Sequence, residues 1–198
     1  GVYKARDISA PGIGMGGIVP ALDYLTASNR KSLGDEVVNF DSGLLNAEGR
    51  DVVVIGGGDT AMDCVRTAIR QKANSVTCLY RRDRANMPGS QREVANAEEE
   101  GVDFRWLSAP QAFLGDNHVR AVQAQKIHLG QPDATGRQVP QIIEDSSHEI
   151  PADLVIKALG FDPEDIPTMF GAPELEVSKW GTIGVDWRTM MTNLPGVF

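Results

Sequence analysis

Val52-Val53-Val54-Ile55-Gly56-Gly57-Gly58-Asp59-Thr60-Ala61 is the stretch that decides the fold of this chain. A run of β-branched residues predicts a buried strand, and a glycine cluster ends it where a helical pattern begins. The start of a helix offers unpaired N–H donors and a partial positive charge, which suit an anion. This order is typical of the first strand–turn–helix of a dinucleotide-binding unit, whose turn holds a pyrophosphate. We therefore predict pyrophosphate contacts from Gly56, Gly57, Gly58, Asp59 and Thr60.

The residues after the glycines indicate which dinucleotide is bound. Apolar residues recur at helical spacing from Ala61 to Ile69, and Val76–Tyr80 is a second short strand. NAD-binding units place an acid about 20 residues after the glycines, on the ribose 2′-OH. Here Arg81 and Arg82 follow the second strand instead, and paired guanidinium groups suit a 2′-phosphate that an acid would repel. The sequence predicts NADPH rather than NADH. A glycine turn alone would also fit a plain strand–helix connection, and paired arginines are usually just solvated.

The composition narrows the class of protein. The chain has 198 residues, 41% hydrophobic and 23% charged, with a formal net charge of −8. A negative net charge disfavours binding to nucleic acid. No apolar run approaches the ~20 residues that are needed to span a bilayer. Cys64 and Cys78 form neither a CxxC pair nor a metal-ligand cluster, so we expect small buried hydrophobic side chains. We predict no metal site and no catalytic acid, base or nucleophile.

Other patterns predict the remaining elements. We expect a helix that carries Ile18, Leu22 and Leu25 on one face and ends between residues 29 and 34. Ser90-Gln91-Arg92-Glu93 matches a capping box, which predicts a second helix from Ser90 to a C-terminal cap at Gly101. The predicted strands cover residues 103–107, 119–129, 139–144, 152–160 and 183–185, with a turn at 133–136.

An acidic run, Glu98-Glu99-Glu100, ends the second of these helices. Such runs are usually a solvated face, which is the interpretation we favour. The alternative is a surface that contacts a partner subunit.

The chain resembles the small (β) subunit of NADPH-dependent glutamate synthase. The most specific matches are Gly56–Thr67, Tyr80–Asp83 and Asn86–Ser90, followed by Arg92–Val94. The resemblance implies an α/β, Rossmann-like three-layer dinucleotide-binding domain with a parallel sheet plus an antiparallel meander. In this family the NADPH domain is inserted into an FAD domain, as in thioredoxin reductase-like flavoproteins. We accordingly expect a connecting segment at 1–45, the NADPH domain at 46–165 and a return segment at 166–198. We expect the tail after about Gly171 to pack poorly without its FAD domain.

The resemblance also implies a function. NADPH would deliver hydride to FAD of the neighbouring domain, with Gly160 and Phe161 near the nicotinamide half. Electrons would then pass through iron–sulfur clusters to a glutamate synthase large subunit, for glutamate biosynthesis from glutamine and 2-oxoglutarate. FAD and the clusters would be held outside this chain, which alone would be inactive, and the protein would be cytoplasmic.

Several alternatives stay open. The electron acceptor could instead be the one used by ferredoxin–NADP oxidoreductase-like or dihydropyrimidine dehydrogenase-like enzymes, or the isolated piece could be a non-catalytic NADPH-binding module. Thioredoxin reductase-like proteins often have a further arginine where this chain has Asn86, while Arg84 is an additional arginine nearby. The third group on the 2′-phosphate is therefore open. The absence of CxxC disfavours thiol–disulfide chemistry.

Overall fold

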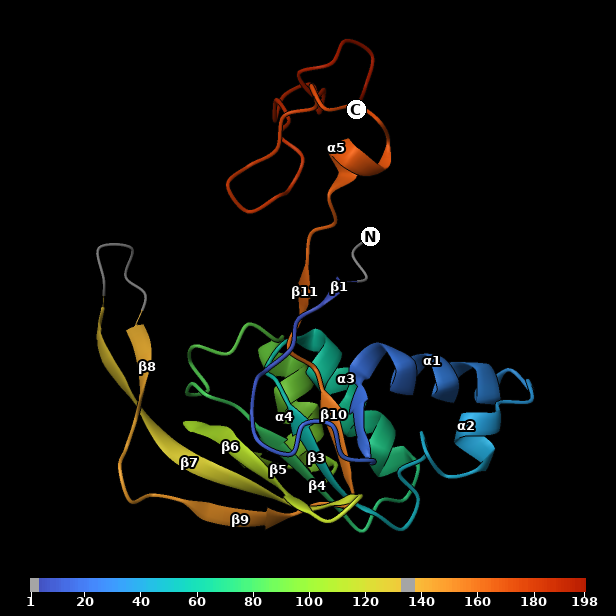
Figure 1. Cartoon of the computed structure of the whole chain (residues 1–198), viewed down its shortest axis with the longest axis vertical. Coiled ribbons are helices and arrows are strands. Elements are labelled where there is room, and N and C mark those ends of the chain that lie inside the picture. The colour runs from blue at the N-terminus through green and yellow to red at the C-terminus, as the bar shows by residue number, and fades with distance from the viewer. Residues whose placement is uncertain (1–3, 133–137) are drawn as a thin grey trace. The chain divides into compact units, whose positions relative to one another are not determined.

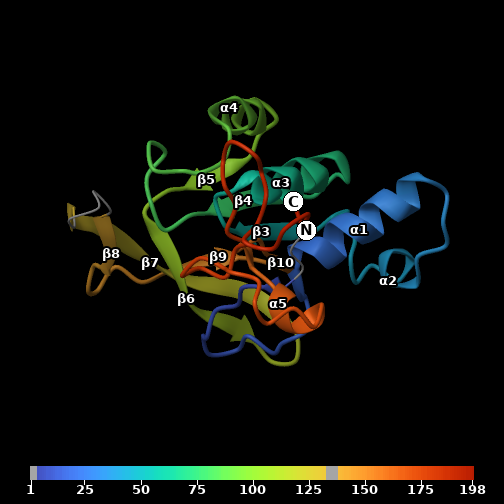
Figure 2. The same ribbon diagram turned by 90° about the horizontal axis from the view of Figure 1, so that it is seen from above.

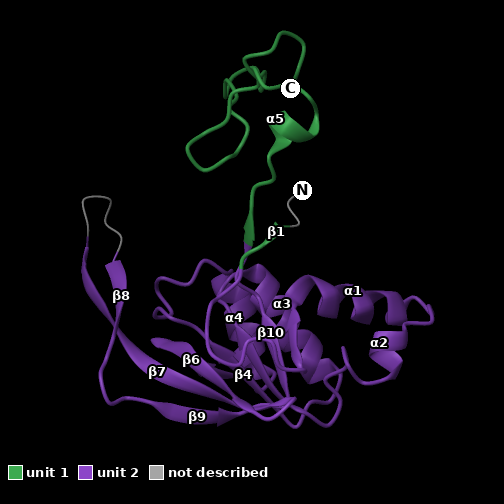
Figure 3. Ribbon diagram, viewed as in Figure 1, with its two compact units in different colours: residues 1–6, 161–198 green, residues 7–160 purple. Residues whose placement is uncertain are grey.

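The computed structural model describes residues 4–132 and 138–198, so the predicted turn at 133–136 lies outside the described residues. The chain divides into two compact units, one of residues 7–160 and one of residues 1–6 with 161–198 (Figure 3). The division expected after residues 45 and 165 stays a prediction. None of the helices in the described ranges is both long and apolar enough to cross a membrane.

A five-stranded parallel sheet forms the centre of the larger unit. Its strands, in spatial order, are β2 (Ile18–Pro20), β10 (Leu154–Lys157), β3 (Asp51–Ile55), β4 (Ser75–Leu79) and β5 (Asp103–Arg105). The central strands are continuous apolar runs because both faces of the sheet are covered. The predicted strands at 52–55 and 76–80 are confirmed, and those at 103–107 and 152–160 are confirmed in shorter form.

Three layers result from the alternation of side chains along these strands. Val52 and Val54 of β3 pack among the helices, whereas Val53 and Ile55 pack in a second cluster with the antiparallel strands. The helical layer contains α1 (Ala21–Ser32), α3 (Asp59–Arg70) and α4 (Gln91–Glu99), and the short α2 (Val38–Asp41) lies beside α1 (Figures 1 and 2). The predicted α/β three-layer fold is thus confirmed.

The opposite layer is an antiparallel sheet. It consists of β6 (Ser108–Gly115), β7 (Val119–Pro132), β8 (Gln138–Ile142) and β9 (His148–Pro151). Strand β7 is the long central member, which pairs with all three others. The predicted meander is therefore present, with β6 and β9 as strands that the sequence pattern did not reveal.

Two predictions about elements are wrong. Ile18 was expected on a helix, but it belongs with Val19 to strand β2, which pairs with β10. Pro20 explains the boundary, because it is the extended N-cap of α1 and could not lie inside that helix. Residues 183–185 form no strand, since Ile183 makes only an isolated bridge with Val177.

The smaller unit contains little regular structure. Strand β1 (Lys4–Ala5) pairs antiparallel with β11 (Phe161–Asp162), and α5 (Ile166–Met169) follows. Many of its large apolar side chains are exposed: Met169, Phe170, Val177, Trp180, Ile183, Trp187, Met190, Val197 and Phe198. Those that follow Gly171 agree with the expectation that this part of the tail packs poorly.

Candidate functional site

The glycine turn joins β3 to α3, and its glycines have different surroundings. Gly56 has φ +150°, and a Cβ there would overlap the main-chain oxygen of Ala158. A Cβ on Gly57 would overlap the ring of Tyr80. By contrast, no atom of another described residue beyond its chain neighbours lies within 4 Å of where a Cβ on Gly58 would be. Gly56 and Gly57 are therefore required by packing, while Gly58 borders open space.

The start of α3 leaves unpaired N–H donors beside this open space. Gly58 is the N-cap, and no side chain in the described ranges caps it. Its carbonyl accepts from Ala61 N (2.9 Å) and Met62 N (3.2 Å), which closes the first helical turn. The amides of Asp59 and Thr60 precede the first N–H that the helix can bond, so they remain available. Open space above main-chain donors at the positive end of a helix fits a phosphate group.

The strand order places this turn at a topological switch point. Strands β4 and β5 lie on one side of β3, and β10 and β2 lie on the other. Ligands of open α/β sheets bind outside the carboxyl ends of the two strands that meet there, here β3 and β10. Gly160 (φ +83°) belongs to the turn that follows β10, at that edge. Phe161 belongs to the smaller unit, where it pairs with Ala5 in β1.

Arg81 and Arg82 follow β4, the neighbour of β3. Leu79 is the register partner of Ile55, and its carbonyl accepts a hydrogen bond from Gly56 N (3.2 Å). The main chain that leads to the two arginines therefore runs beside the glycine turn. Arg81 is exposed and forms no ion pair with residues 4–132 or 138–198. Arg82 is half-buried and donates from Nη2 to the carbonyl of Gln138 (3.3 Å).

The two candidates for a third group on the 2′-phosphate are already occupied. Arg84 Nη1 forms an ion pair with Glu98 (2.8 Å). Asn86 Nδ2 donates to Asp83 Oδ1 (2.8 Å). Arg84 would have to break its ion pair with Glu98 to bind a ligand, and Asn86 would have to break its hydrogen bond to Asp83. Arg81 has no ion pair with the described residues to break.

The predicted capping box does not form. The side chain of Ser90 makes no capping hydrogen bond, and Glu93 pairs with Arg66 of α3 instead. The main-chain N–H of Ser90 donates to Asp59 Oδ1 (2.9 Å). The helix that the capping box predicted is nevertheless present, with Gly101 (φ +98°) after its last turn.

The acidic run agrees in part with its interpretation as a solvated face: Glu98 and Glu99 are exposed, and Glu100 is half-buried. Glu100 pairs with Arg66 (2.8 Å) and Arg70 (3.3 Å), and Glu98 pairs with Arg84. The Arg66 guanidinium lowers the pKa of the Glu100 carboxyl, while the carboxylate raises the pKa of Arg66. Glu99 forms no ion pair with the residues that the structure describes.

Cys64 and Cys78 are free, fully buried thiols, as predicted. Burial raises the pKa of Cys78 to about 12, and it raises the pKa of Cys64 further. Both thiols therefore stay protonated, and thiolate chemistry is excluded at these positions in the folded chain.

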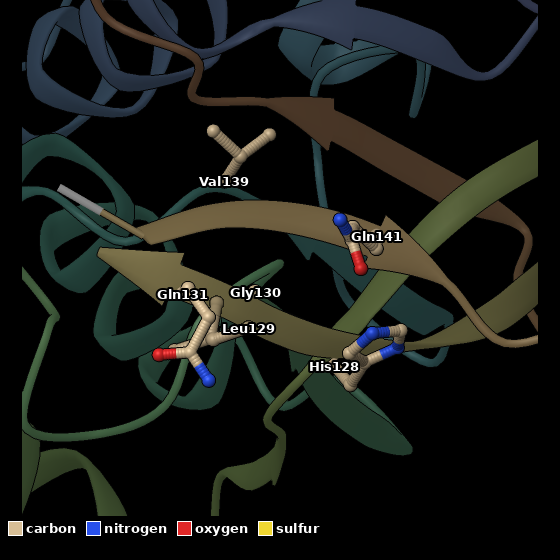
Figure 4. A pocket seen from close by; sticks show the side chains of 6 residues that line it. All are labelled: His128, Leu129, Gly130, Gln131, Val139 and Gln141. Atoms are coloured by element: carbon tan, nitrogen blue, oxygen red, sulfur yellow. The ribbon is translucent and has the colours of Figure 1, made fainter. Parts of the chain in front are cut away.

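The β7–β8 hairpin has a hollow of about 490 Å³ on its surface (Figure 4). Its lining consists of His128, Leu129, Gly130, Gln131, Val139 and Gln141. None of the predicted site residues belongs to it. The hollow is a feature of the hairpin alone and is distinct from the glycine turn.

Comparison with known proteins identifies a matching protein family and similar proteins. The model of the family "Pyridine nucleotide-disulphide oxidoreductase" matches residues 5–198. "Glutamate synthase [NADPH] small chain" of Azospirillum brasilense is 68% identical over 198 residues, which is 100% of this chain and 41% of that protein. "Putative glutamate synthase [NADPH] small chain" of Cereibacter sphaeroides is 67% identical over 198 residues, covering 100% of this chain and 47% of that protein. The chain thus spans less than half the length of these relatives.

A solved structure shares the fold. Mycobacterium tuberculosis FprA in complex with NADPH superposes with a TM-score of 0.69 at 17% sequence identity, over 84% of this chain and 50% of that one. At this identity the likeness shows the fold alone.

Proposed function

Because the chain belongs to the pyridine nucleotide-disulphide oxidoreductase family, we propose that residues 7–160 bind NADPH and position it for hydride transfer. The single observation that carries this proposal is the open, donor-lined start of α3 at Gly58. A pyrophosphate there would accept hydrogen bonds from the main-chain N–H groups of Gly58, Asp59 and Thr60. Gly56 and Gly57 contribute by allowing the close packing that shapes the turn.

The adenosine 2′-phosphate would meet Arg81 and Arg82. Both follow the strand that lies next to the glycine turn, and Arg81 is without an acidic partner among the described residues. A guanidinium group donates two parallel hydrogen bonds to a phosphate, which gives selectivity for NADPH over NADH.

The nicotinamide half would extend towards the carboxyl end of β10, where Gly160 and then Phe161 follow. When bound, NADPH supplies a hydride from its nicotinamide ring. The chain's own part is to bind, orient and shield that ring, because direct hydride transfer needs no acid or base from the protein.

In the full-length protein we propose the role of a glutamate synthase small subunit. The identity of 68% with the Azospirillum brasilense small chain supports this role. The hydride acceptor would be FAD, bound by parts of the protein outside this chain, and iron–sulfur clusters would pass electrons to a large subunit. The alternative is the same NADPH domain in an oxidoreductase with another acceptor. Copurification of a large amidotransferase-like partner with the full-length protein would separate these two possibilities. The cytoplasmic location stays a prediction.

Titration calorimetry of the purified 198-residue chain with NADPH and with NADH tests the binding proposal. We expect NADPH to bind at least about tenfold more tightly, which corresponds to about 1.4 kcal/mol. Equal affinities would refute the choice of NADPH, and absence of binding by both nucleotides would refute the site itself.

A further inference from the structure

An acidic side chain lies where the proposed function places a pyrophosphate. Asp59 is in the first turn of α3, the turn whose N–H groups face the open space beside Gly58. A carboxylate free to face the same space would repel a phosphate. In the structure Asp59 Oδ1 instead accepts a hydrogen bond from the main-chain N–H of Ser90, at 2.9 Å.

A second contact joins the same two segments. Gly89, the residue before Ser90, donates from its main-chain N to the carbonyl of Gly57 (3.0 Å). A Cβ on Gly89 would lie 3.1 Å from that oxygen, so the approach is close. Residues 83–90, which we call the outer loop, are thus bound to the glycine turn at their end by two hydrogen bonds.

The first part of the outer loop is held by contacts that do not involve the glycine turn. The Tyr80 hydroxyl donates to the carbonyl of Asn86 (3.2 Å), and Asp83 accepts from the main-chain N of Asn86 (2.8 Å). Met87 is buried among the residues of the helical layer. These contacts hold residues 80–87. Gly89 is held by the glycine turn, and Ser90 is held both by Asp59 and by α4, where its carbonyl accepts from Val94 N (3.0 Å).

Helix α4 is held to α3 by other groups. Arg66 of α3 pairs with Glu93 and with Glu100 of the segment that contains α4. Loss of the Asp59 contact would therefore leave α4 in place and free only the residues just before it.

We propose that the carboxylate of Asp59 is a positioning group that holds Gly89 and Ser90 as the outer wall of the pyrophosphate site, and that this carboxylate does not contact the phosphates. This inference rests on the proposed function, since it assigns a role within the same site. The wall restricts solvent access to the phosphates and keeps the carboxylate of Asp59 turned to its donor. Both effects concern the pyrophosphate, which NADPH and NADH share, so they do not affect the choice between them.

Two substitutions break the contact from opposite sides. Asp59→Ala removes the acceptor. Ser90→Pro removes the N–H donor, and Ser90 has φ −57°, which proline adopts without strain. The matched controls are Asp59→Asn, which keeps a side-chain oxygen acceptor, and Ser90→Ala, which removes only a hydroxyl that makes no capping bond.

Calorimetry on the 198-residue chain would measure NADPH and NADH binding for each variant. We expect Asp59→Ala and Ser90→Pro each to weaken both nucleotides by about tenfold, with the NADPH preference unchanged. The double variant should be no weaker than either single variant, because both remove one interaction. Asp59→Asn and Ser90→Ala should each retain more affinity for both nucleotides than Asp59→Ala and Ser90→Pro do, because the acceptor oxygen and the N–H donor are kept.

A separate ligand distinguishes positioning from loss of structure. 2′-AMP has the adenosine 2′-phosphate but no pyrophosphate, so its binding, followed by NMR titration, should be unchanged in Asp59→Ala and Ser90→Pro. Parallel loss of 2′-AMP binding would show a structural defect and overturn the proposal. Tighter nucleotide binding by Asp59→Ala would show that the carboxylate faces the phosphates, which also overturns it. If the unmodified chain bound neither nucleotide, the proposed function itself would be refuted. If the unmodified chain bound NADPH and the variants Asp59→Ala and Ser90→Pro bound it equally well, only the role of Asp59 would be refuted.

Discussion

Replacement of Arg81 by alanine tests the cofactor choice with little risk to the fold. Arg81 is exposed and makes no ion pair with the described residues, so its removal should leave the stability of the chain unchanged. A hydrogen bond between charged groups contributes about 1.5–3 kcal/mol. Its loss corresponds to a decrease in NADPH affinity of about 10- to 150-fold. NADH lacks the 2′-phosphate, so its affinity should stay the same.

Arg82 is half-buried, and its side chain makes a hydrogen bond to another element. Its Nη2 donates to the carbonyl of Gln138 at 3.3 Å, which connects the end of β4 to the β7–β8 hairpin. Arg82→Ala should therefore weaken NADPH by a similar factor and also accelerate hydrogen exchange in the hairpin. Arg81→Ala should not change exchange in the hairpin.

Arg84→Ala is the matched control, because Arg84 lies in the same segment and is occupied by Glu98 at 2.8 Å. Arg84→Ala removes one positive charge close in sequence to Arg81. Its effect on NADPH affinity therefore measures the contribution of long-range electrostatics to the effect of Arg81→Ala. We expect less than a threefold change in NADPH affinity from the loss of a partly exposed arginine. Calorimetry with both nucleotides would refute the argument if Arg81→Ala weakened NADPH and NADH alike, or if Arg84→Ala matched its effect.

Three further predictions concern the glycine turn and the buried thiols. Gly56→Ala should lower the free energy of unfolding by more than about 2 kcal/mol, because Gly56 has a positive φ and the new Cβ would overlap the oxygen of Ala158. Urea titrations measure this, and an unchanged midpoint would contradict it. Gly58→Ala should change stability by about 1 kcal/mol or less yet weaken NADPH at least about tenfold in calorimetry, since its Cβ would occupy the open space of the site. Cys64 and Cys78 should resist alkylation at pH 8 and react fully in urea, because burial raises their pKa values and holds both as thiols; labelling of the native chain, read by mass spectrometry, would count against it.

The strand–turn–helix–strand unit could be predicted because its signals are local. The β-branched run of β3 is buried on both faces, so nothing in the tertiary structure competes with its strand preference. The same reasoning failed at Ile18. Its spacing from Leu22 and Leu25 fits a helix, but β10 offers parallel pairing to Ile18 and Val19, and the helix begins only after Pro20, at Ala21. Contacts between segments more than 130 residues apart decided that case, and no short window of sequence contains them.

Charged residues were interpreted less well than apolar ones. Glu100 was expected in solvent, yet it is half-buried and pairs with Arg66 of α3, whereas Glu98 is exposed as expected and pairs with Arg84. A run of like charges on one helix does not show whether a neighbouring segment supplies the opposite charge. The interpretation depends on which helix packs beside it, and here that helix is α3.

The failed capping box explains how the site was only partly predicted. Ser90 and Glu93 have the right spacing, but Arg66 takes the glutamate, and the N–H that it would have capped is taken by Asp59. Glu93 pairs with Arg66 rather than with the Ser90 N–H, because a charged donor forms a stronger hydrogen bond to a carboxylate than a neutral amide does, and the Ser90 N–H bonds to Asp59 instead. The hydrogen bond between Ser90 N–H and Asp59 also holds the end of the outer loop against the glycine turn. The sequence showed the inner wall of the proposed pyrophosphate site as a motif, whereas the outer wall follows from where α3 and α4 meet. For this reason Gly89 and Ser90 could be assigned to the site only once the packing of these two helices was known.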